Sequence, residues 1–207
     1  MNATEIDTIN SQQHKNSPPA FKLLIFMALF MVTGICFLLF LGREKARILG
    51  QTITELDIQP LWNTIEPITP DRMAGKVVVL HFWGYWCGDC VKEYPEFIKV
   101  HQKFSKDSSV LFASVSCPKS DENKELLTFY TKKFATINGG DELPFYCDPA
   151  EYSRAQISKL MTSGGFAYPT TLVLDGEGRV VDIWRSAITG DTLEKAIEKA
   201  KGTLGKS

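Results

Sequence analysis

The chain has 207 residues, of which 44% are hydrophobic and 23% are charged, so it is neither a disordered nor a fibrous protein. Its formal net charge of −1 leaves no excess of basic residues, which argues against a nucleic-acid-binding protein. The five cysteines are too few for a disulfide-dense scaffold. Their positions therefore carry more information than their number.

The first predicted element is an uncharged apolar run over residues 23–41, which follows a polar tail over residues 1–22 that we expect to be flexible. A helix over this run would be about 28 Å long, which matches the hydrocarbon core of a bilayer. A cleavable signal peptide has a shorter apolar core that ends in small residues, whereas Gly42-Arg43-Glu44-Lys45 follow this run. The sequence therefore predicts an uncleaved transmembrane helix. The flanking charges slightly favour a cytoplasmic C-terminal side, opposite to the orientation that the chemistry below favours.

A linker over residues 42–52 is expected to lead into one globular domain over residues 53–207. Short β-branched and aromatic runs are typical of buried strands, and apolar residues at helical spacing are typical of amphipathic helices. In chain order, these patterns predict an extended segment at 53–63, a short helix after Thr69-Pro70, a strand at 76–83, a helix at 87–104, a strand at 110–115, a helix at 121–134, a strand at 143–146, a helix at 151–161, strands at 170–174 and 179–184, and a last helix whose capping box begins at Asp191. This alternation predicts an α/β fold in which helices cover both faces of a mixed central sheet.

The strongest chemical motif is Trp86-Cys87-Gly88-Asp89-Cys90, which falls where the first long strand ends and a helix begins. Cysteines at this spacing on a helix start have sulfurs within disulfide reach. Because the helix N-terminus stabilises a thiolate, we expect Cys87 to attack disulfides and the deeper Cys90 to resolve the mixed disulfide. A zinc site would need a second Cys/His pair at suitable spacing, and a purely structural disulfide would close too small a loop to stabilise much. We therefore predict redox chemistry with no metal and no cofactor beyond the dithiol.

The run HFWGYWCGDC, the following Glu93 and Pro95, and the later Tyr168-Pro169-Thr170-Thr171 resemble the thioredoxin superfamily. More narrowly, the chain is similar to the TlpA-like membrane-anchored thiol–disulfide oxidoreductases, a redoxin group that includes proteins of cytochrome c maturation. The resemblance covers roughly residues 50–204 and includes the extra strand and helix that this group carries. It implies a thioredoxin-like fold with an inserted strand–helix unit.

The resemblance also implies roles for residues around the motif. Pro169 would be the cis-proline that faces the cysteines, rather than an ordinary trans proline, and the backbone at Tyr168 would pair with the substrate polypeptide. Glu93 would lie beneath the cysteine pair and accept or relay the proton of the resolving thiol; the alternative is a solvated glutamate that merely suits the helix dipole. Trp86 would either form part of an apolar docking rim for the substrate or pack the active-site turn.

Cys117 and Cys147 each end a predicted strand. If those strands are parallel neighbours, both thiols lie at one edge of the sheet, so a second disulfide competes with two free thiols.

Two further residues bear on the chemistry. Asp89 stands where thioredoxin has proline, and its negative charge beside Cys87 disfavours the thiolate, which favours a reductant over an oxidant. His81 on the central strand is expected in the core; copper binding would need a different cysteine spacing.

Together the motif and the resemblance predict a thiol–disulfide oxidoreductase in the inner cell membrane, with its domain on the periplasmic side. It would reduce a protein disulfide substrate and be re-reduced by a membrane electron donor. The first alternative is a peroxiredoxin-like peroxidase, although that chemistry uses a threonine three residues before the attacking cysteine, where this chain has Gly84. The second is a non-catalytic partner-binding or assembly module on the same fold.

Overall fold

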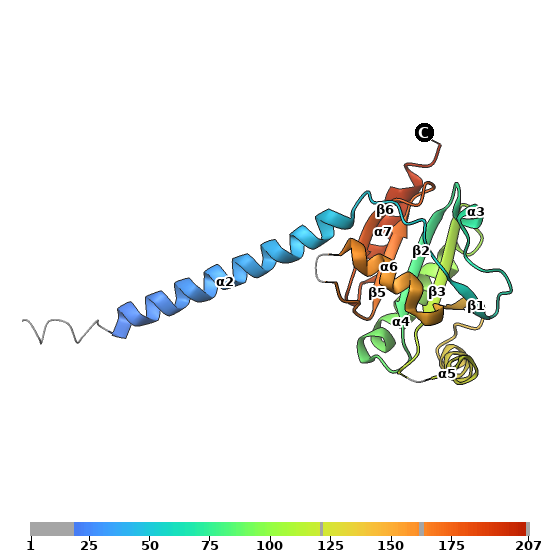
Figure 1. Ribbon diagram of the computed structural model, residues 1–207, viewed down its shortest axis with the longest axis horizontal. Coiled ribbons are helices and arrows are strands. Elements are labelled where there is room, and N and C mark those ends of the chain that lie inside the picture. The colour runs from blue at the N-terminus through green and yellow to red at the C-terminus, as the bar shows by residue number, and fades with distance from the viewer. Residues whose placement is uncertain (1–18, 121, 162–163, 206–207) are drawn as a thin grey trace, which may run out of the picture. The chain divides into compact units, whose positions relative to one another are not determined.

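The computed structural model describes residues 19–120, 122–161 and 164–205. The chain divides into two compact units, one ending at Arg43 and the other running from Glu44 to Ser207 (Figure 1). Most of the predicted polar tail, residues 1–18, lies outside the described residues.

The N-terminal helix α2 (Pro19–Ile48) contains the predicted transmembrane run and continues beyond it. Among the described residues, one window, Lys22–Leu39, is long and apolar enough to cross a membrane by length and composition, and none of it is buried inside the structure. The expected linker over 42–52 is therefore helical as far as Ile48. The physical reason is that residues 43–48 contain no proline or glycine, and the helix ends only before Gly50, whose φ of 77° is unsuited to a helix.

The domain is built on a six-stranded mixed sheet with the order β1-β4-β3-β2-β5-β6. Strands β2, β3 and β4 run parallel to one another, whereas β1, β5 and β6 pair antiparallel with their neighbours. The predicted mixed sheet is thus confirmed. The strands are β1 (Gln59–Trp62), β2 (Val77–Trp83), β3 (Val110–Ser116), β4 (Phe145–Cys147), β5 (Thr170–Leu174) and β6 (Val180–Trp184).

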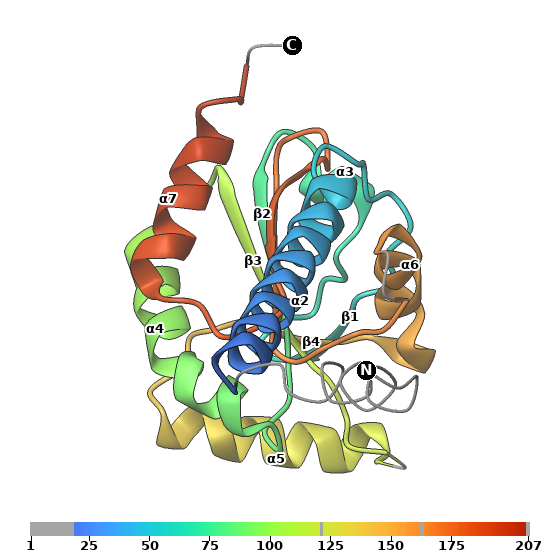
Figure 2. The ribbon, with the colours of Figure 1, turned by 90° about the vertical axis from the view of Figure 1, so that its left-hand side faces the viewer.

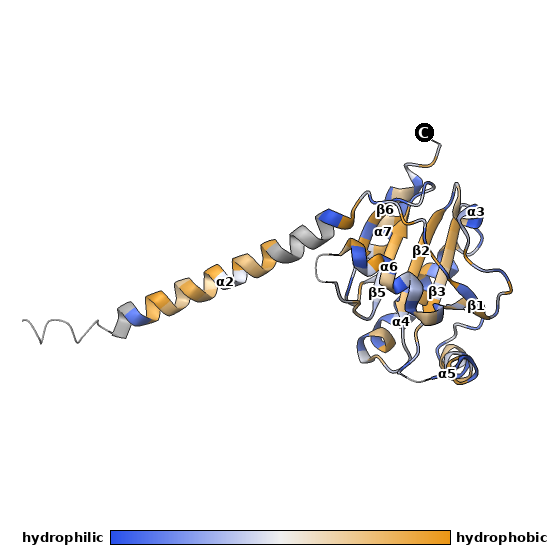
Figure 3. Ribbon diagram, in the orientation of Figure 1, coloured by the Kyte–Doolittle hydropathy of each residue, from blue (hydrophilic) through white to orange (hydrophobic). Residues whose placement is uncertain are grey.

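Helices cover both faces of this sheet, as predicted (Figure 2). One core cluster joins the sheet to α4 and α7, and the other joins it to α3 and α6. Strand β2 is buried over its whole length because its alternate residues enter both clusters, which explains why all of its residues except His81 are apolar. Apolar colour accordingly concentrates on the central strands and along α2 (Figure 3). The helices are α3 (Pro70–Met73), α4 (Gly88–Phe104), α5 (Lys124–Ile137), α6 (Tyr152–Leu160) and α7 (Gly190–Lys201), with a 3₁₀ turn at Pro149–Glu151.

The start of the last helix differs from the prediction. Helix α7 is capped by Thr189, whose hydroxyl accepts a hydrogen bond from the backbone N–H of Thr192 at 3.4 Å. The prediction of a capping box at Asp191 is wrong because the helix already begins at Gly190, after the extended Thr189, so Asp191 is inside the helix and is not its cap. Asp191 instead lies in the first turn, where its charge suits the helix dipole.

Candidate active site

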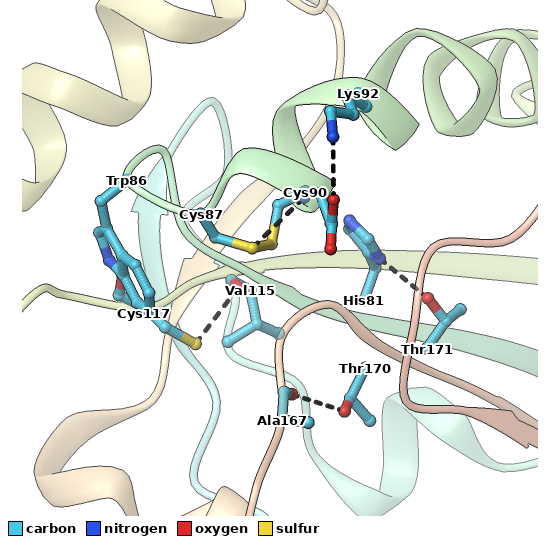
Figure 4. The surroundings of a disulfide bond; sticks show 11 residues. His81, Trp86, Cys87, Cys90, Lys92, Val115, Cys117, Ala167, Thr170 and Thr171 are labelled. Carbon is cyan, nitrogen blue, oxygen red and sulfur yellow. Dashed lines mark hydrogen bonds and ion pairs between the residues drawn. A yellow bond between two sulfur atoms is a disulfide. The ribbon is translucent and has the colours of Figure 1, made fainter.

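The cysteine pair lies where β2 gives way to α4. Cys87 is the N-cap of α4, and its sulfur accepts a hydrogen bond from the backbone N–H of Cys90 at 3.3 Å. The two sulfurs form a disulfide, with the Cα atoms 5.3 Å apart (Figure 4). Cys87 is partly exposed, whereas Cys90 is completely buried. Only Cys87 is therefore placed to meet a sulfur that arrives from outside.

The charge of Asp89 affects Cys87 less than the sequence suggests. The Asp89 carboxylate is well exposed and lies 3.2 Å from the ammonium group of Lys92, one turn along the helix. Solvent and this cation screen its charge. The Asp89 carboxylate therefore opposes the dipole of α4 at a Cys87 thiolate only in part.

Glu93 lies one helical turn after Cys90, on the same face of α4. Its side chain is buried with 4% exposure, so the solvated alternative does not hold. One carboxylate oxygen accepts a hydrogen bond from the backbone N–H of Ile188 at 3.4 Å, and the other has no partner among the described residues. Burial raises the pKa of Glu93 to about 7, because a charged carboxylate is poorly solvated there.

His81 lies on β2 and is completely buried, as expected for a core histidine. Its Nδ1 lies 3.0 Å from the hydroxyl of Thr171 on β5, and its ring stacks on Phe97 of α4 with 4.2 Å between centroids. Figure 4 draws it with the cysteine pair, on the strand that leads into the motif. Burial lowers the pKa of His81 to about 3, so the imidazole is neutral. Among the described residues, no group of three or more His, Cys, Asp or Glu side chains could hold a metal ion.

The segment before β5 borders the cysteine motif. The Tyr168–Pro169 peptide bond is cis, as the resemblance implied. The Tyr168 ring packs edge-on against Trp86 with 5.2 Å between centroids, and the Trp86 indole N–H donates to the backbone carbonyl of Cys117 at 3.1 Å. Trp86 keeps 37% of its surface exposed. It therefore packs the active-site turn and also presents an apolar surface next to Cys87.

The glycine before the motif is required by Trp86. A Cβ atom at Gly84 would lie 2.6 Å from atoms of the Trp86 indole ring, closer than atoms can pack. Gly84 is the position at which the peroxidase alternative needs a threonine.

Cys117 and Cys147 are both free thiols, so the second disulfide is not formed. The expected neighbouring, parallel strands are present, but Cys147 pairs with Ser116 rather than with Cys117. Because side chains alternate along a strand, the two thiols point to opposite faces of the sheet. Burial raises the pKa of Cys117 to about 12, which keeps it a thiol.

Sequence reasoning missed a polar network beside this site. Asp148 and Arg154 form a buried ion pair with 2.9 Å between Oδ2 and Nε, and Arg154 also donates a hydrogen bond to the Tyr168 hydroxyl. The Asp148-Pro149 dipeptide is a helix-start signal that marks Asp148 as a cap, but nothing in the sequence indicates which arginine it binds.

The sheet order, the dithiol at the end of β2 and the cis-proline opposite Trp86 together define a thioredoxin-like protein. More particularly, the chain belongs to the AhpC/TSA family, whose model matches residues 49–183.

Known relatives agree with this assignment. The chain is 28% identical over 127 residues to the thiol-disulfide oxidoreductase ResA of Bacillus thuringiensis, across 60% of this chain and 64% of that protein. It is 26% identical over 163 residues to ResA of Geobacillus thermodenitrificans, across 78% and 83% of the two chains. The match thus spans slightly less than two thirds of the first relative. The crystal structure of StoA from Bacillus subtilis shares the fold, with a TM-score of 0.53 and 21% identity across 70% of this chain and 98% of that one.

Proposed function

We propose that the protein is a membrane-tethered thiol–disulfide oxidoreductase that reduces disulfides of polypeptides outside the cytoplasm. The observation that carries the proposal is the asymmetry of the pair: Cys87 is accessible at a helix N-terminus, and Cys90 is buried behind it. Relatives named thiol-disulfide oxidoreductase match most of the domain and support it.

The reaction begins from the dithiol form. The Cys87 thiolate attacks one sulfur of a substrate disulfide, so that a mixed disulfide forms and the other substrate sulfur leaves as a thiolate. Cys90 then loses its proton and attacks the Cys87 sulfur, which releases the second substrate sulfur. Two electrons pass to the substrate, and the Cys87–Cys90 disulfide remains.

Glu93 is our candidate acceptor of the Cys90 proton. It lies one turn from Cys90, and its second carboxylate oxygen has no partner in the part of the chain that the structure describes. Its pKa of about 7 suits reversible proton transfer near neutral pH. A side chain of this kind would hold the proton while the disulfide forms and return it when the pair is reduced again.

The setting of the reaction follows from α2 and from redox chemistry. The Lys22–Leu39 window would anchor the chain in the inner membrane, and a disulfide substrate persists only in an oxidising compartment such as the periplasm. A membrane electron donor carrying a dithiol would restore the reduced pair. Apocytochrome c, a copper-site protein and envelope proteins in general are the candidate substrates.

A redox titration of the full chain in detergent, followed by tryptophan fluorescence, tests the proposal because Trp86 adjoins the pair. We expect one two-electron transition below about −200 mV, which Cys87→Ser abolishes and Cys147→Ser, a matched control at a free thiol, leaves unchanged. A potential near −120 mV would make the protein an oxidant instead.

Two further results separate the alternatives. Cys90→Ser should trap a mixed disulfide with a polypeptide substrate, because the resolving thiol is missing. If the protein consumed hydrogen peroxide faster than it reduced disulfides, the peroxidase would be favoured. If Cys87→Ser abolished neither activity, a binding module would be favoured.

A further inference from the structure

The inserted unit between β3 and β5 holds a buried ion pair. The side chains of Arg154 and Asp148 are 5% and 0% exposed, with 2.9 Å between Nε and Oδ2. The Asp148 carboxylate also accepts from the backbone N–H groups of Ser153 at 2.7 Å and Arg154 at 3.0 Å. The Asp148 carboxylate therefore binds N–H groups in the first turn of α6, whose N-cap position is Glu151, and fixes the arginine at the same time.

The free end of that arginine reaches the active-site border. Arg154 Nη1 donates a hydrogen bond to the Tyr168 hydroxyl, and its guanidinium carbon lies 5.9 Å from the centroid of the Tyr168 ring. The Tyr168 ring in turn packs against Trp86, the residue before Cys87. A continuous chain of contacts thus joins α6 to the partly exposed aromatic surface beside the attacking sulfur.

Stability alone is a weak reason for this arrangement. A buried ion pair is often no more stabilising than apolar side chains of similar size, and Asp148 could bind the first-turn N–H groups of α6 without an arginine. The guanidinium is a planar group whose donors bind in fixed directions, so it can hold the Tyr168 hydroxyl and the carboxylate at once. This geometry suits a residue that fixes the position of another.

We infer that Arg154, held by Asp148, is a positioning residue that sets Tyr168 against Trp86 and so shapes the surface on which a polypeptide disulfide docks. The inference rests on the proposed function. A polypeptide must lie across Trp86 and Tyr168 to bring its disulfide to Cys87, whereas a small disulfide needs only the sulfur. Loss of the network should therefore slow the reaction with polypeptides and spare the reaction with small disulfides.

The test compares two oxidants of the reduced full-length chain in detergent: insulin, whose disulfides belong to a polypeptide, and oxidised glutathione. Tryptophan fluorescence gives the second-order rate constant for each. Tyr168→Phe removes only the hydroxyl and keeps the ring. The double variant Arg154→Met with Asp148→Asn removes both charges together, and asparagine can still accept hydrogen bonds from the first turn of α6.

For both variants we expect the insulin rate constant to fall about five- to tenfold, the size of effect of one lost hydrogen bond, while the glutathione rate constant stays within about twofold. The redox potential of the pair should not change. Arg179→Met is the matched control, because Arg179 also binds a largely buried carboxylate, Asp175, with 2.9 Å between Nε and Oδ2. That pair lies at the opposite end of β5 and should affect neither rate.

Equal losses with both oxidants would mean a merely structural role, and unchanged rates in Tyr168→Phe would also overturn the inference. If the double variant does not fold, Tyr168→Phe decides alone. A wild-type chain that reduces neither oxidant would refute the proposed function itself, which is a different result from the loss of selectivity in a variant.

Discussion

Glu93→Gln gives the sharpest prediction about the buried carboxyl one helical turn after Cys90. Below about pH 4.5 the carboxyl is neutral in the folded and the unfolded chain, and well above pH 7 it is ionised in both. Between these limits the folded chain holds a proton that the unfolded chain has released. The free energy of unfolding therefore falls as the pH rises through this window, and Glu93 costs stability at alkaline pH.

The size of this effect follows from the two pKa values. The interval from the ordinary value of 4.5 to about 7 in the folded chain corresponds to roughly 3 kcal/mol. Glutamine has nearly the same shape and cannot ionise. Relative to wild type, Glu93→Gln should therefore gain up to about 3 kcal/mol between pH 4.5 and pH 8, on top of any offset that does not depend on pH.

Urea unfolding of the oxidised chain, measured at several pH values by tryptophan fluorescence, would give this difference directly. Glu96→Gln on the same helix is the matched control, because Glu96 lies at the surface and pairs with Lys99 at 2.6 Å, which lowers its pKa. Glu96→Gln should lower the free energy of unfolding slightly at neutral pH, which is opposite in sign to the change expected for Glu93→Gln. If the stabilities of Glu93→Gln and wild type run parallel across this range, Glu93 is not a buried carboxyl of raised pKa, and its proposed role in proton transfer fails.

Three further predictions concern the surrounding core. Burial lowers the pKa of His81 to about 3, so a folded chain resists protonation of this residue. As the pH falls from 6.5 to 3, the free energy of unfolding of wild type should therefore fall by up to about 5 kcal/mol more than that of His81→Leu, measured by urea unfolding in acidic buffers. Ser114→Ala should cost about 1–3 kcal/mol in the same assay, since it leaves the buried indole N–H of Trp83 without its acceptor at 2.9 Å; an unchanged midpoint would contradict that bond. Mass spectrometry after alkylation of the unfolded, oxidised chain should count three labels, including those on Cys117 and Cys147. A count of one would show that Cys117 and Cys147 form the second disulfide.

The elements that could be predicted best are those whose local residue pattern agrees with their place in the folded domain. Strand β2 is apolar on both faces because it is buried on both faces, and α4 starts at its cysteine because the sulfur itself caps the helix. The redox motif and the cis-proline were recognisable for the same reason, since each is a short contiguous run. Their placement beside one another follows from the antiparallel pairing of β2 with β5.

Features that depend on register or on long-range pairing were not predictable. The sequence places Cys117 and Cys147 at the ends of two adjacent strands, but an offset of one residue decides whether they share a face. The contact of Arg154 with Tyr168 joins two segments whose local patterns say nothing of each other. The start of α7 was missed by a smaller margin, because two cap-forming residues lie within three positions and backbone conformation selects the first.

The close contact between Gly84 and the Trp86 ring restricts which residues position 84 can accept. A threonine there, as in a peroxidase of the peroxiredoxin type, would place its Cβ against the Trp86 ring at 2.6 Å. The ring would have to move, and it now donates a hydrogen bond to the carbonyl of Cys117 at 3.1 Å. A threonine at this position has to be accompanied by a shift or replacement of Trp86, so the two residues are coupled in any such change.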